Sequence, residues 1–373
     1  MRQVDIKNFR KVTLRKLRER VAVIKSHLPK ARRYIITYSK NFTLSLSNYC
    51  QNFCGYCFYN FRIPKVEGKR NVVLIENEEI LDIIQKGVLY NCKEALIMSG
   101  EKADTFKEVK ERLRKRNHDN FIDFVKDISR KLLDSKLLPH TNIGILTYDE
   151  LKNLKDYNAS MGLMLESTSM KLFKKGGVHE QSPGKIPDER IEHIKNAGKL
   201  KIPFTTGLLL GIGESFEDRV KDLYLIKKIH DLYGHIQEII IQNFVDKPSI
   251  PYRPRTPIKI KDILRIVGIA KVIFENDISI QVPPNLISGY EKDFIAMGID
   301  DFGGISPFTL DYINPSNKWP QIDELETICK SDGYVLKERL PVYDKFIRKN
   351  GYCPENIKKT IDIININDES PDL

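Results

Sequence analysis

The sequence predicts an α/β protein built on a (β/α)8 barrel of the TIM type. Short apolar runs rich in branched side chains alternate with amphipathic stretches along most of the chain. Eight such units follow one another over about 260 residues, which suits a barrel of this size. Because the short runs are apolar on both faces, we expect parallel strands joined by helical crossovers.

The expected elements can be read in chain order. The strands are predicted at Thr43–Ser47, Glu94–Met98, Leu137–His140, Ala159–Leu165, Phe204–Leu210, Glu238–Gln242, Ile278–Val282 and Gly298–Phe302. The amphipathic stretches predict helices at Glu78–Tyr90, Asn120–Ser135, Tyr148–Tyr157, Asp188–Ala197, Phe216–Tyr233 and Ile260–Phe274. Chemistry in such barrels sits at the carboxyl ends of the strands, so residues that follow the strands are the first candidates for a site.

The chain is expected to divide into three parts. Residues 1–40 form a basic N-terminal helical extension, and residues 41–319 form the barrel. Residues 320–373 form a C-terminal helix and tail that pack on one end of the barrel as a capping segment. The whole chain of 373 residues is long enough for one large domain with such additions.

Positive charge is concentrated at the amino end. The formal net charge is +11, and residues 1–40 contain 13 Lys and Arg but only two acidic residues. A basic arm of this kind could bind nucleic acid or an acidic partner. We favour a solvated helix face, because Leu17, Val21 and Ile24 recur at helical spacing and few aromatic side chains lie among the charges.

The composition is typical of a soluble globular protein, with 41% hydrophobic and 30% charged residues. The apolar runs are far shorter than a membrane span, and no apolar core follows the first basic residues. We therefore expect a cytoplasmic protein with no export signal and no membrane partner.

Three of the six cysteines lie close together in the sequence. The segment reads Cys50-Gln-Asn-Phe-Cys54-Gly-Tyr-Cys57 and follows the first expected strand. Structural zinc sites usually have four protein ligands, and no fourth Cys or His lies nearby. A cubane iron–sulfur cluster on three cysteines leaves one iron open for an external ligand. We predict such a cluster on Cys50, Cys54 and Cys57, with a zinc site completed by a distant ligand as the alternative.

The spacing C-x3-C-x2-C, with aromatic Tyr56 before the last cysteine, resembles the signature of the radical S-adenosylmethionine superfamily. The position also agrees, because that superfamily carries the motif in the loop after the first barrel strand. The resemblance implies a [4Fe–4S] cluster and S-adenosylmethionine as cofactors, with Tyr56 beside them. It also implies an external one-electron reductant as a partner.

The end of the second expected strand reads Ser99-Gly100-Glu101. It resembles the Gly-Gly-Glu turn of the superfamily, so the resemblance implies that Ser99, Gly100 and Glu101 bind the amino group of the methionine moiety. A carboxylate at a strand end can pair with an ammonium group. A β-turn with a solvated glutamate is the alternative.

Two later strand ends also match cofactor-binding positions of the superfamily. Glu166 follows the fourth expected strand, and the resemblance implies that it accepts hydrogen bonds from the ribose hydroxyls. Lys185 lies where related enzymes place a cation on the methionine carboxylate, with a solvated lysine as the alternative. Gly207 and Gly211 fit the pattern G-x-I-x-G-x-x-E, in which glycines let a cofactor approach the backbone.

Short segments between residues 35 and 345 resemble the 7,8-didemethyl-8-hydroxy-5-deazariboflavin synthases of this superfamily. They are Tyr38–Asn41, Leu138–Asn142, Ala159–Glu166, Lys201–Gly207, Gly234–Glu238, Gln242–Phe244, Pro283–Leu286 and Gly298–Pro307. In that family a sister transferase supplies the adduct 5-amino-5-(4-hydroxybenzyl)-6-(D-ribitylimino)uracil. The resemblance implies hydrogen abstraction from this adduct, ring closure to the deazaflavin and release of ammonia. A transient complex with the sister transferase is a further expectation.

Polar residues near strands six to eight are expected to contact the substrate. Gln242, Asn243 and Asn285 supply amides suited to a uracil ring or a ribityl chain. Asp300 and Asp301 are expected at the eighth strand end, where a catalytic carboxylate could orient the substrate or accept a proton as ammonia leaves. Because adjacent strand residues point to opposite faces, only one of the two should face the barrel interior.

Two other functions share part of this pattern. The sister transferase, or another small-molecule radical enzyme, would have the same cysteines, fold and cofactors. The run Gly298–Pro307 and the single cysteine motif weigh against both. A zinc-stabilised protein that uses the basic amino end would bind nucleic acid with a strong salt dependence. We do not expect nucleic acid as a partner, because the cysteine motif favours the cluster.

Overall fold

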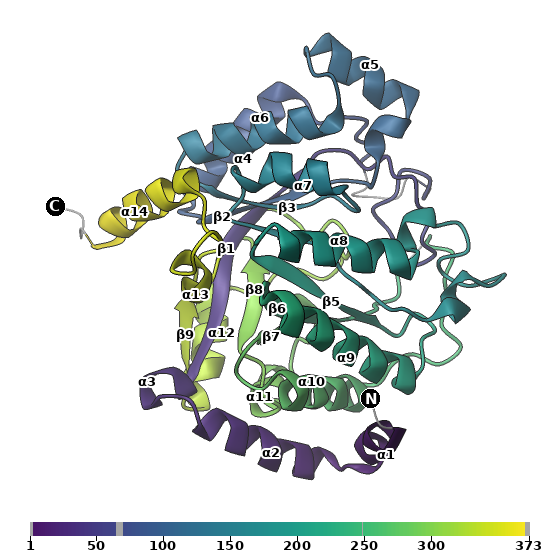
Figure 1. Cartoon of the computed structure of the whole chain (residues 1–373), viewed down its shortest axis with the longest axis vertical. Helices are drawn as coiled ribbons and strands as arrows, with labels where there is room; N and C mark the ends of the chain where they lie inside the picture. Colours follow the sequence, from purple (N-terminus) through teal and green to yellow (C-terminus); the bar gives the residue numbers. More distant parts are fainter. Residues whose placement is uncertain (1–2, 65–69, 248, 370–373) are drawn as a thin grey trace.

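The structure is a computed structural model that describes residues 3–64, 70–247 and 249–369 (Figure 1). Eight parallel strands close into a barrel, because β1 pairs with both β2 and β8. The barrel strands are β1 (Ile35–Ser45), β2 (Glu94–Met98), β3 (Leu138–Asn142), β4 (Ser160–Gly162), β5 (Phe204–Leu210), β6 (Ile236–Asn243), β7 (Ser279–Gln281) and β8 (Asp301–Ile305), and an additional strand, β9 (Val335–Glu338), pairs with β1. The predicted (β/α)8 barrel is confirmed.

Helices follow the strands and surround the barrel (Figure 1). They are α1 (Gln3–Lys11), α2 (Leu14–Ser26), α3 (Lys30–Arg33), α4 (Asn77–Leu89), α5 (Lys107–Lys115), α6 (Phe121–Asp134), α7 (Tyr148–Lys155), α8 (Pro187–Lys199), α9 (Phe216–Tyr233), α10 (Ile260–Phe274), α11 (Glu291–Ala296), α12 (Ile322–Ser331), α13 (Asp344–Ile347) and α14 (Glu355–Glu369). The predicted bounds of β2, β5, α9 and α10 agree with the structure. For α9 the local signals are strong, because Ser215 and Asp218 form a capping box and Gly234 ends the helix at φ +62°.

The first strand is longer than predicted, and a ninth strand was missed. Residues 35–38 of β1 pair with β9, whereas residues 41–45 pair with β2. β8 pairs with one edge of β1, so β9 and β2 share the opposite edge. β9 continues the sheet along that edge before β2 begins to pair. Residues 35–38 read Ile-Ile-Thr-Tyr and β9 reads Val-Leu-Lys-Glu, so each begins with only two aliphatic residues, and β9 is partly exposed. Neither therefore has the continuous apolar run by which the other strands were recognised.

The basic amino end folds as three helices and then enters β1 at Ile35. Leu17 and Val21 of α2 are buried, and α2 packs against α10 beneath the barrel (Figure 1). The close approach of α2 requires Gly298 at φ +100°, since a Cβ there would lie 2.7 Å from Val21 Cγ1.

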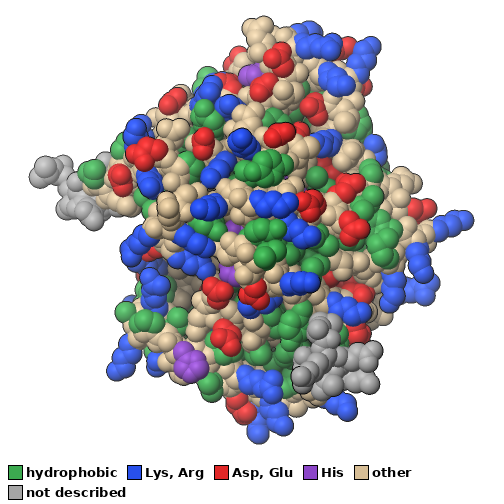
Figure 2. Space-filling view, viewed as in Figure 1, with side chains coloured by type: hydrophobic (Ala, Val, Ile, Leu, Met, Phe, Trp, Pro, Cys, Tyr) green, Lys and Arg blue, Asp and Glu red, His purple; other side chains and the backbone are tan. Residues whose placement is uncertain are grey.

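Figure 2 shows basic and acidic side chains interspersed over one face of the molecule.

The C-terminal segment closes the amino end of the barrel. Arg339 follows β9 and reaches into the interior, where its guanidinium lies 2.7 Å from Glu238 of β6 and 2.6 Å from Asp301 of β8. The Pro341 carbonyl accepts hydrogen bonds from Ser160 Oγ and Gln237 Nε2. One end of the barrel is therefore filled by protein groups, and only the carboxyl ends of the strands remain for a site.

None of the described helices is long and apolar enough to cross a membrane.

Candidate active site

The three clustered cysteines occupy the loop that follows β1. Cys54 is buried, and Cys50 and Cys57 are partly buried. Two sulfur atoms already accept hydrogen bonds, Cys50 Sγ from the Glu101 backbone N–H at 3.2 Å and Cys54 Sγ from Ser182 Oγ at 3.3 Å. Hydrogen bonds of this kind orient thiolate ligands and tune an iron–sulfur cluster.

The thiols are held in an environment that suits ligands better than free nucleophiles. Burial raises the pKa of Cys50 to about 11 and that of Cys54 to about 12, and the neighbouring Cys57 adds to both shifts. Such thiols keep their protons until a metal centre displaces them. The donor set therefore fits a cluster that binds three thiolates.

The alternative of a zinc site finds no ligand set in the described part of the chain. No three His, Cys, Asp or Glu side chains converge there on a point that could hold a single metal ion. A cubane makes no such demand, because its three cysteine sulfurs bind three different iron atoms.

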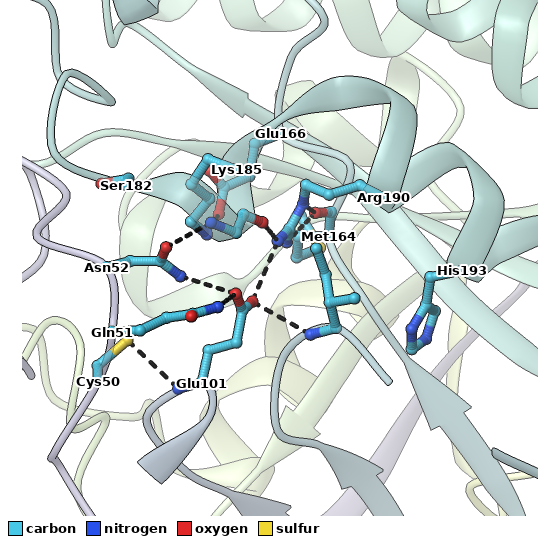
Figure 3. A network of polar contacts seen from close by, with 12 residues as sticks. Cys50, Gln51, Asn52, Glu101, Met164, Glu166, Ser182, Lys185, Arg190 and His193 are labelled. Carbon is cyan, nitrogen blue, oxygen red and sulfur yellow. Dashed lines mark hydrogen bonds and ion pairs between the residues drawn. The ribbon is translucent and has the colours of Figure 1, made fainter. Parts of the chain in front are cut away.

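Glu101 ties the cysteine loop to the rest of the barrel mouth (Figure 3). Its Oε1 accepts hydrogen bonds from Gln51 Nε2 at 2.8 Å and Asn52 Nδ2 at 3.0 Å. Its Oε2 accepts from the Ile145 backbone N–H at 3.1 Å and lies 3.5 Å from the Arg190 guanidinium. Four protein donors thus surround this buried carboxylate, so Glu101 positions the cysteine loop directly.

Two glycines make room for Glu101. A Cβ on Gly184 would lie 1.4 Å from Glu101 Oε1, and a Cβ on Gly144, which has φ +93°, would lie 2.2 Å from Glu101 Cγ. Gly100 has a similar role one residue earlier, because a Cβ there would lie 2.1 Å from the Tyr49 carbonyl oxygen. Any larger side chain at these positions would displace backbone or Glu101 itself.

Glu166 and Lys185 form an ion pair at the centre of the site. Lys185 Nζ lies 2.5 Å from Glu166 Oε1, while Glu166 Oε2 accepts a hydrogen bond from the Tyr56 hydroxyl and lies 3.3 Å from His179 Nε2. Glu166 has φ +63°, a left-handed conformation that is uncommon for a side chain of this size. Strained residues of this kind cluster at functional sites. The structure therefore brings together Tyr56, Glu166 and Lys185, and their contact with the cofactor stays a prediction.

The charges of this pair are set by their neighbours. Burial alone would raise the pKa of Glu166, but Lys185, His179 and Arg190 together hold it well below its usual range. Burial and Arg190 lower the pKa of Lys185, yet Glu166 and other acidic neighbours leave it raised overall. Both groups are therefore ionised, and each can bind a ligand group of the opposite polarity.

The glycine pattern at the end of β5 forms a compact turn. A Cβ on Gly207 would lie 2.1 Å from the Ile240 carbonyl oxygen, and Gly211 has φ +92°. Glu214 closes the turn by accepting hydrogen bonds from the Gly211 and Ile212 N–H groups at 2.7 and 2.8 Å. Glu214 thus stabilises the strand end, and the glycines keep the backbone close to the site.

A cavity of about 850 Å³ adjoins the cysteine loop. Phe53 and Gly55 of that loop line it, together with Val178, Gly211 and Gly213. The cysteine motif and the β5 glycines therefore meet at the same open space, although they are far apart in sequence.

The three residues predicted to contact the substrate, Gln242, Asn243 and Asn285, do not all point into the barrel. Glu238 points into the barrel interior, so Gln242, four residues later on β6, shares that face. Asn243 lies on the other face, and its Nδ2 donates to the Leu286 carbonyl at 3.4 Å. Asn285 follows β7, where its Nδ2 donates to Asp311 Oδ2 at 2.9 Å. Gln242 and Asn285 remain the stronger candidates for substrate contact.

The predicted position of the two aspartates is wrong. Asp301 begins β8 instead of ending it, and Asp300 precedes the strand, so both lie at the closed end of the barrel. Asp300 points outward to Lys271 Nζ at 2.9 Å, and Asp301 points inward to Arg339. The expected split between an outward and an inward side chain is confirmed, but both carboxylates are held in ion pairs far from the cysteine loop. The strand begins three residues later than predicted, and its interior contains Gly303 and Gly304, which weaken a strand signal in the sequence.

Two further residues of the site, Arg190 and His179, are not predicted from the sequence. Arg190 lies on α8, where its guanidinium contacts Glu101 and donates to the carbonyls of Met164 and Gly184 (Figure 3). His179 contacts both Tyr56 and Glu166. The sequence signal for these residues is weak, since an arginine in an amphipathic helix is normally solvated.

Comparison with known proteins agrees with this site. The chain matches the Radical SAM superfamily over residues 44–226. A protein of Methanococcus maripaludis is 48% identical over 84% of this chain and 92% of its own length. A protein of Methanocaldococcus jannaschii is 48% identical over 89% of this chain and 90% of its own, and one of Methanothermobacter thermautotrophicus is 44% identical over 87% and 96%. All three are named 7,8-didemethyl-8-hydroxy-5-deazariboflavin synthase.

Solved structures share the fold at low sequence identity. HydG, a maturase of the [FeFe]-hydrogenase, has a TM-score of 0.71 at 15% identity and covers 100% of this chain and 98% of its own. Methylornithine synthase has a TM-score of 0.67 at 15% identity and covers 89% of this chain and 93% of its own. These two structures support the barrel alone. Together, the match over the cysteine motif and the identity to named relatives over the whole barrel show that this chain is a radical enzyme with a [4Fe–4S] cluster and S-adenosylmethionine as cofactors, and that it belongs to the 7,8-didemethyl-8-hydroxy-5-deazariboflavin synthase family.

Proposed function

We propose that this protein converts 5-amino-5-(4-hydroxybenzyl)-6-(D-ribitylimino)uracil into 7,8-didemethyl-8-hydroxy-5-deazariboflavin with release of ammonia. The observation that carries the proposal is the 44–48% identity to three synthases over nearly their full lengths. The site adds a single three-cysteine loop at the open end of a barrel, which provides one radical centre.

Cys50, Cys54 and Cys57 would hold the cluster, with Glu101 and Ser182 fixing the sulfur atoms of the first two. When bound and reduced, the cofactors supply a primary alkyl radical that is able to remove hydrogen from an unactivated C–H bond. The barrel contributes position and exclusion of water, because its other end is filled by Arg339 and its partners.

The ion pair between Glu166 and Lys185 would open when S-adenosylmethionine binds. Lys185 offers its ammonium group to the methionine carboxylate, and Glu166 accepts hydrogen bonds from the ribose hydroxyls. The backbone at Gly100 is close to Cys50, and together with the adjacent Ser99 it would suit the methionine amino group. On binding, Lys185 would thus exchange the Glu166 carboxylate for the methionine carboxylate, and Glu166 would exchange the Lys185 ammonium group for the ribose hydroxyls.

Substitution Glu166→Gln tests this exchange. Loss of a charged acceptor should weaken binding of S-adenosylmethionine by about 1.5–3 kcal/mol, which is roughly tenfold to a hundredfold in Kd. Calorimetry on the iron-loaded protein would measure the change, with iron per chain as the check on folding. Glu189→Gln, an exposed change on α8, should leave Kd unaltered. A wild-type Kd for Glu166→Gln would remove this residue from the cofactor site.

The partners follow from the reaction. The adduct would come from the sister transferase, which could pass it on in a transient complex, and electrons would come from an external one-electron reductant. All six cysteines are free thiols in the structure, which fits a reducing compartment such as the cytoplasm.

Incubation of the reconstituted protein with reductant, S-adenosylmethionine and the adduct tests the proposed function. We expect 5′-deoxyadenosine together with a fluorescent deazaflavin and ammonia. Tyrosine and 5-amino-6-(D-ribitylamino)uracil without the transferase should give no deazaflavin. Consumption of tyrosine by the protein alone would identify it as the transferase instead.

A further inference from the structure

Lys247, in the segment that follows β6, is a buried cation beside the cysteine loop. Its side chain is 5% exposed, and its Nζ donates to Asn314 Oδ1 at 2.8 Å and lies 5.4 Å from the centre of the Phe244 ring. No carboxylate of the described residues forms an ion pair with it. Buried lysines normally have such a partner, so this ammonium group has donor capacity left for a ligand.

The position of Lys247 connects it to the radical centre. Phe244 belongs to the apolar cluster that contains Cys54 and Tyr56, and Cys57 packs against the same cluster. Burial lowers the pKa of Lys247, and the nearby Cys57, Asp311 and Asp246 oppose that shift. Lys247 therefore lies beside the group of side chains that packs on the cysteine loop.

The loops after β6, β7 and β8 join around Lys247. Asp311 accepts hydrogen bonds from Asn285 Nδ2 at 2.9 Å and from Asn314 Nδ2 at 3.0 Å, and backbone N–H groups occupy its other oxygen. Asp311 is thus saturated and holds the two asparagines in place. Asn285 Oδ1, by contrast, is buried and has no hydrogen-bond partner among the described residues. An unpartnered buried acceptor of this kind calls for a ligand donor or an ordered water.

We propose that Lys247 and Asn285 recognise the pyrimidinedione ring of the substrate, a role that rests on the proposed function. The ring edge carries carbonyl oxygens and N–H groups in alternation. Lys247 Nζ donates to a ring carbonyl oxygen, and Asn285 Oδ1 accepts from a ring N–H. Lys247 is a positioning residue, because it holds the adduct next to the cysteine loop and takes no part in breaking the C–H bond.

Substitution Lys247→Met removes the donor and keeps an unbranched side chain. We expect the KM for the adduct to rise at least tenfold and 5′-deoxyadenosine to form in excess over deazaflavin, because a misplaced substrate is missed by the radical. Iron per chain and the Kd for S-adenosylmethionine should remain those of the wild type. Lys247→Arg keeps a cation at this position, so it should form less excess 5′-deoxyadenosine over deazaflavin than Lys247→Met does.

A matched control is Lys25→Met. Lys25 is also buried, at 7% exposure, but it donates to the Ile299 carbonyl at the closed end of the barrel. That variant should lose thermal stability without a change in KM or in the ratio of the two products. Asn314→Asp is a second probe, because it gives Lys247 a carboxylate partner and should also raise KM. The new carboxylate replaces the amide that donates to Asp311 Oδ2 at 3.0 Å, so iron per chain is measured to check the fold.

The outcomes separate this inference from the proposed function. Wild-type protein that makes deazaflavin establishes the function, and a wild-type KM in both Lys247→Met and Asn314→Asp then overturns the role of Lys247. Loss of iron in Lys247→Met also overturns it, because the lysine would then support the cysteine loop. If Lys247→Met does not fold, the role of Lys247 is tested with Lys247→Arg and Asn314→Asp instead. The measurements are again the KM for the adduct and the ratio of 5′-deoxyadenosine to deazaflavin.

Discussion

Replacement of Cys50, Cys54 or Cys57 by Ala should abolish cleavage of S-adenosylmethionine and remove most of the bound iron. A three-cysteine cluster has no spare protein ligand, and the described residues offer no other group of three ligating side chains at the site. Iron per chain, the absorbance of the cluster and the yield of 5′-deoxyadenosine after anaerobic reconstitution measure the effect.

The other three cysteines provide matched controls. Cys92, Cys329 and Cys353 are also buried, but Cys92 lies between α4 and β2, Cys329 lies in α12 and Cys353 precedes α14, all outside the motif. Their change to Ala removes little buried volume and should keep both iron and activity. If any one of them proved necessary for the cluster, the assignment of three ligands would be wrong.

Arg339→Met should lower the free energy of unfolding by about 3–5 kcal/mol, because it leaves two buried carboxylates without their cation. Arg339 contacts Glu238 at 2.7 Å and Asp301 at 2.6 Å, and the Tyr343 hydroxyl and Thr205 hydroxyl complete the hydrogen bonds of Glu238. Burial already raises the pKa of Glu238 against the effect of Arg339. Chemical denaturation with and without the substitution would measure the loss.

The loss should depend on pH. Burial raises the folded-state pKa of Glu238 to about 7 even beside Arg339, so the wild type itself loses some stability as the pH rises toward 7. Without the guanidinium the folded pKa lies higher still. A carboxyl with a raised folded pKa contributes stability at low pH and loses it as pH rises, so the deficit of the variant relative to the wild type should grow above about pH 7. Arg18→Met is the control, because Arg18 and Asp293 form an exposed pair worth at most about 1 kcal/mol. An equal, small effect in both variants would contradict the structural role of Arg339.

The amino-acid sequence by itself determined the fold class and predicts the three cluster ligands. Strand and helix periodicity are local properties, so β2, β5, α9 and α10 could be predicted with their bounds. The cysteine motif is also local, because its three ligands come from one loop. Glu166 and Lys185 could be found for a related reason: each lies directly after a recognisable strand or turn of the barrel mouth.

Only the tertiary structure decided which distant groups meet. Arg190 and Gly184 enclose Glu101 although about 80 to 90 residues separate them in sequence, and Arg339 crosses the barrel to Glu238 and Asp301. Such contacts leave no period or spacing in the sequence, because each depends on how the barrel closes.

Asp300 and Asp301 show the consequence most clearly. Moving the start of β8 by three residues places Asp301 at the closed floor of the barrel, where a carboxylate requires a cation, and not at the open mouth, where it could serve a substrate.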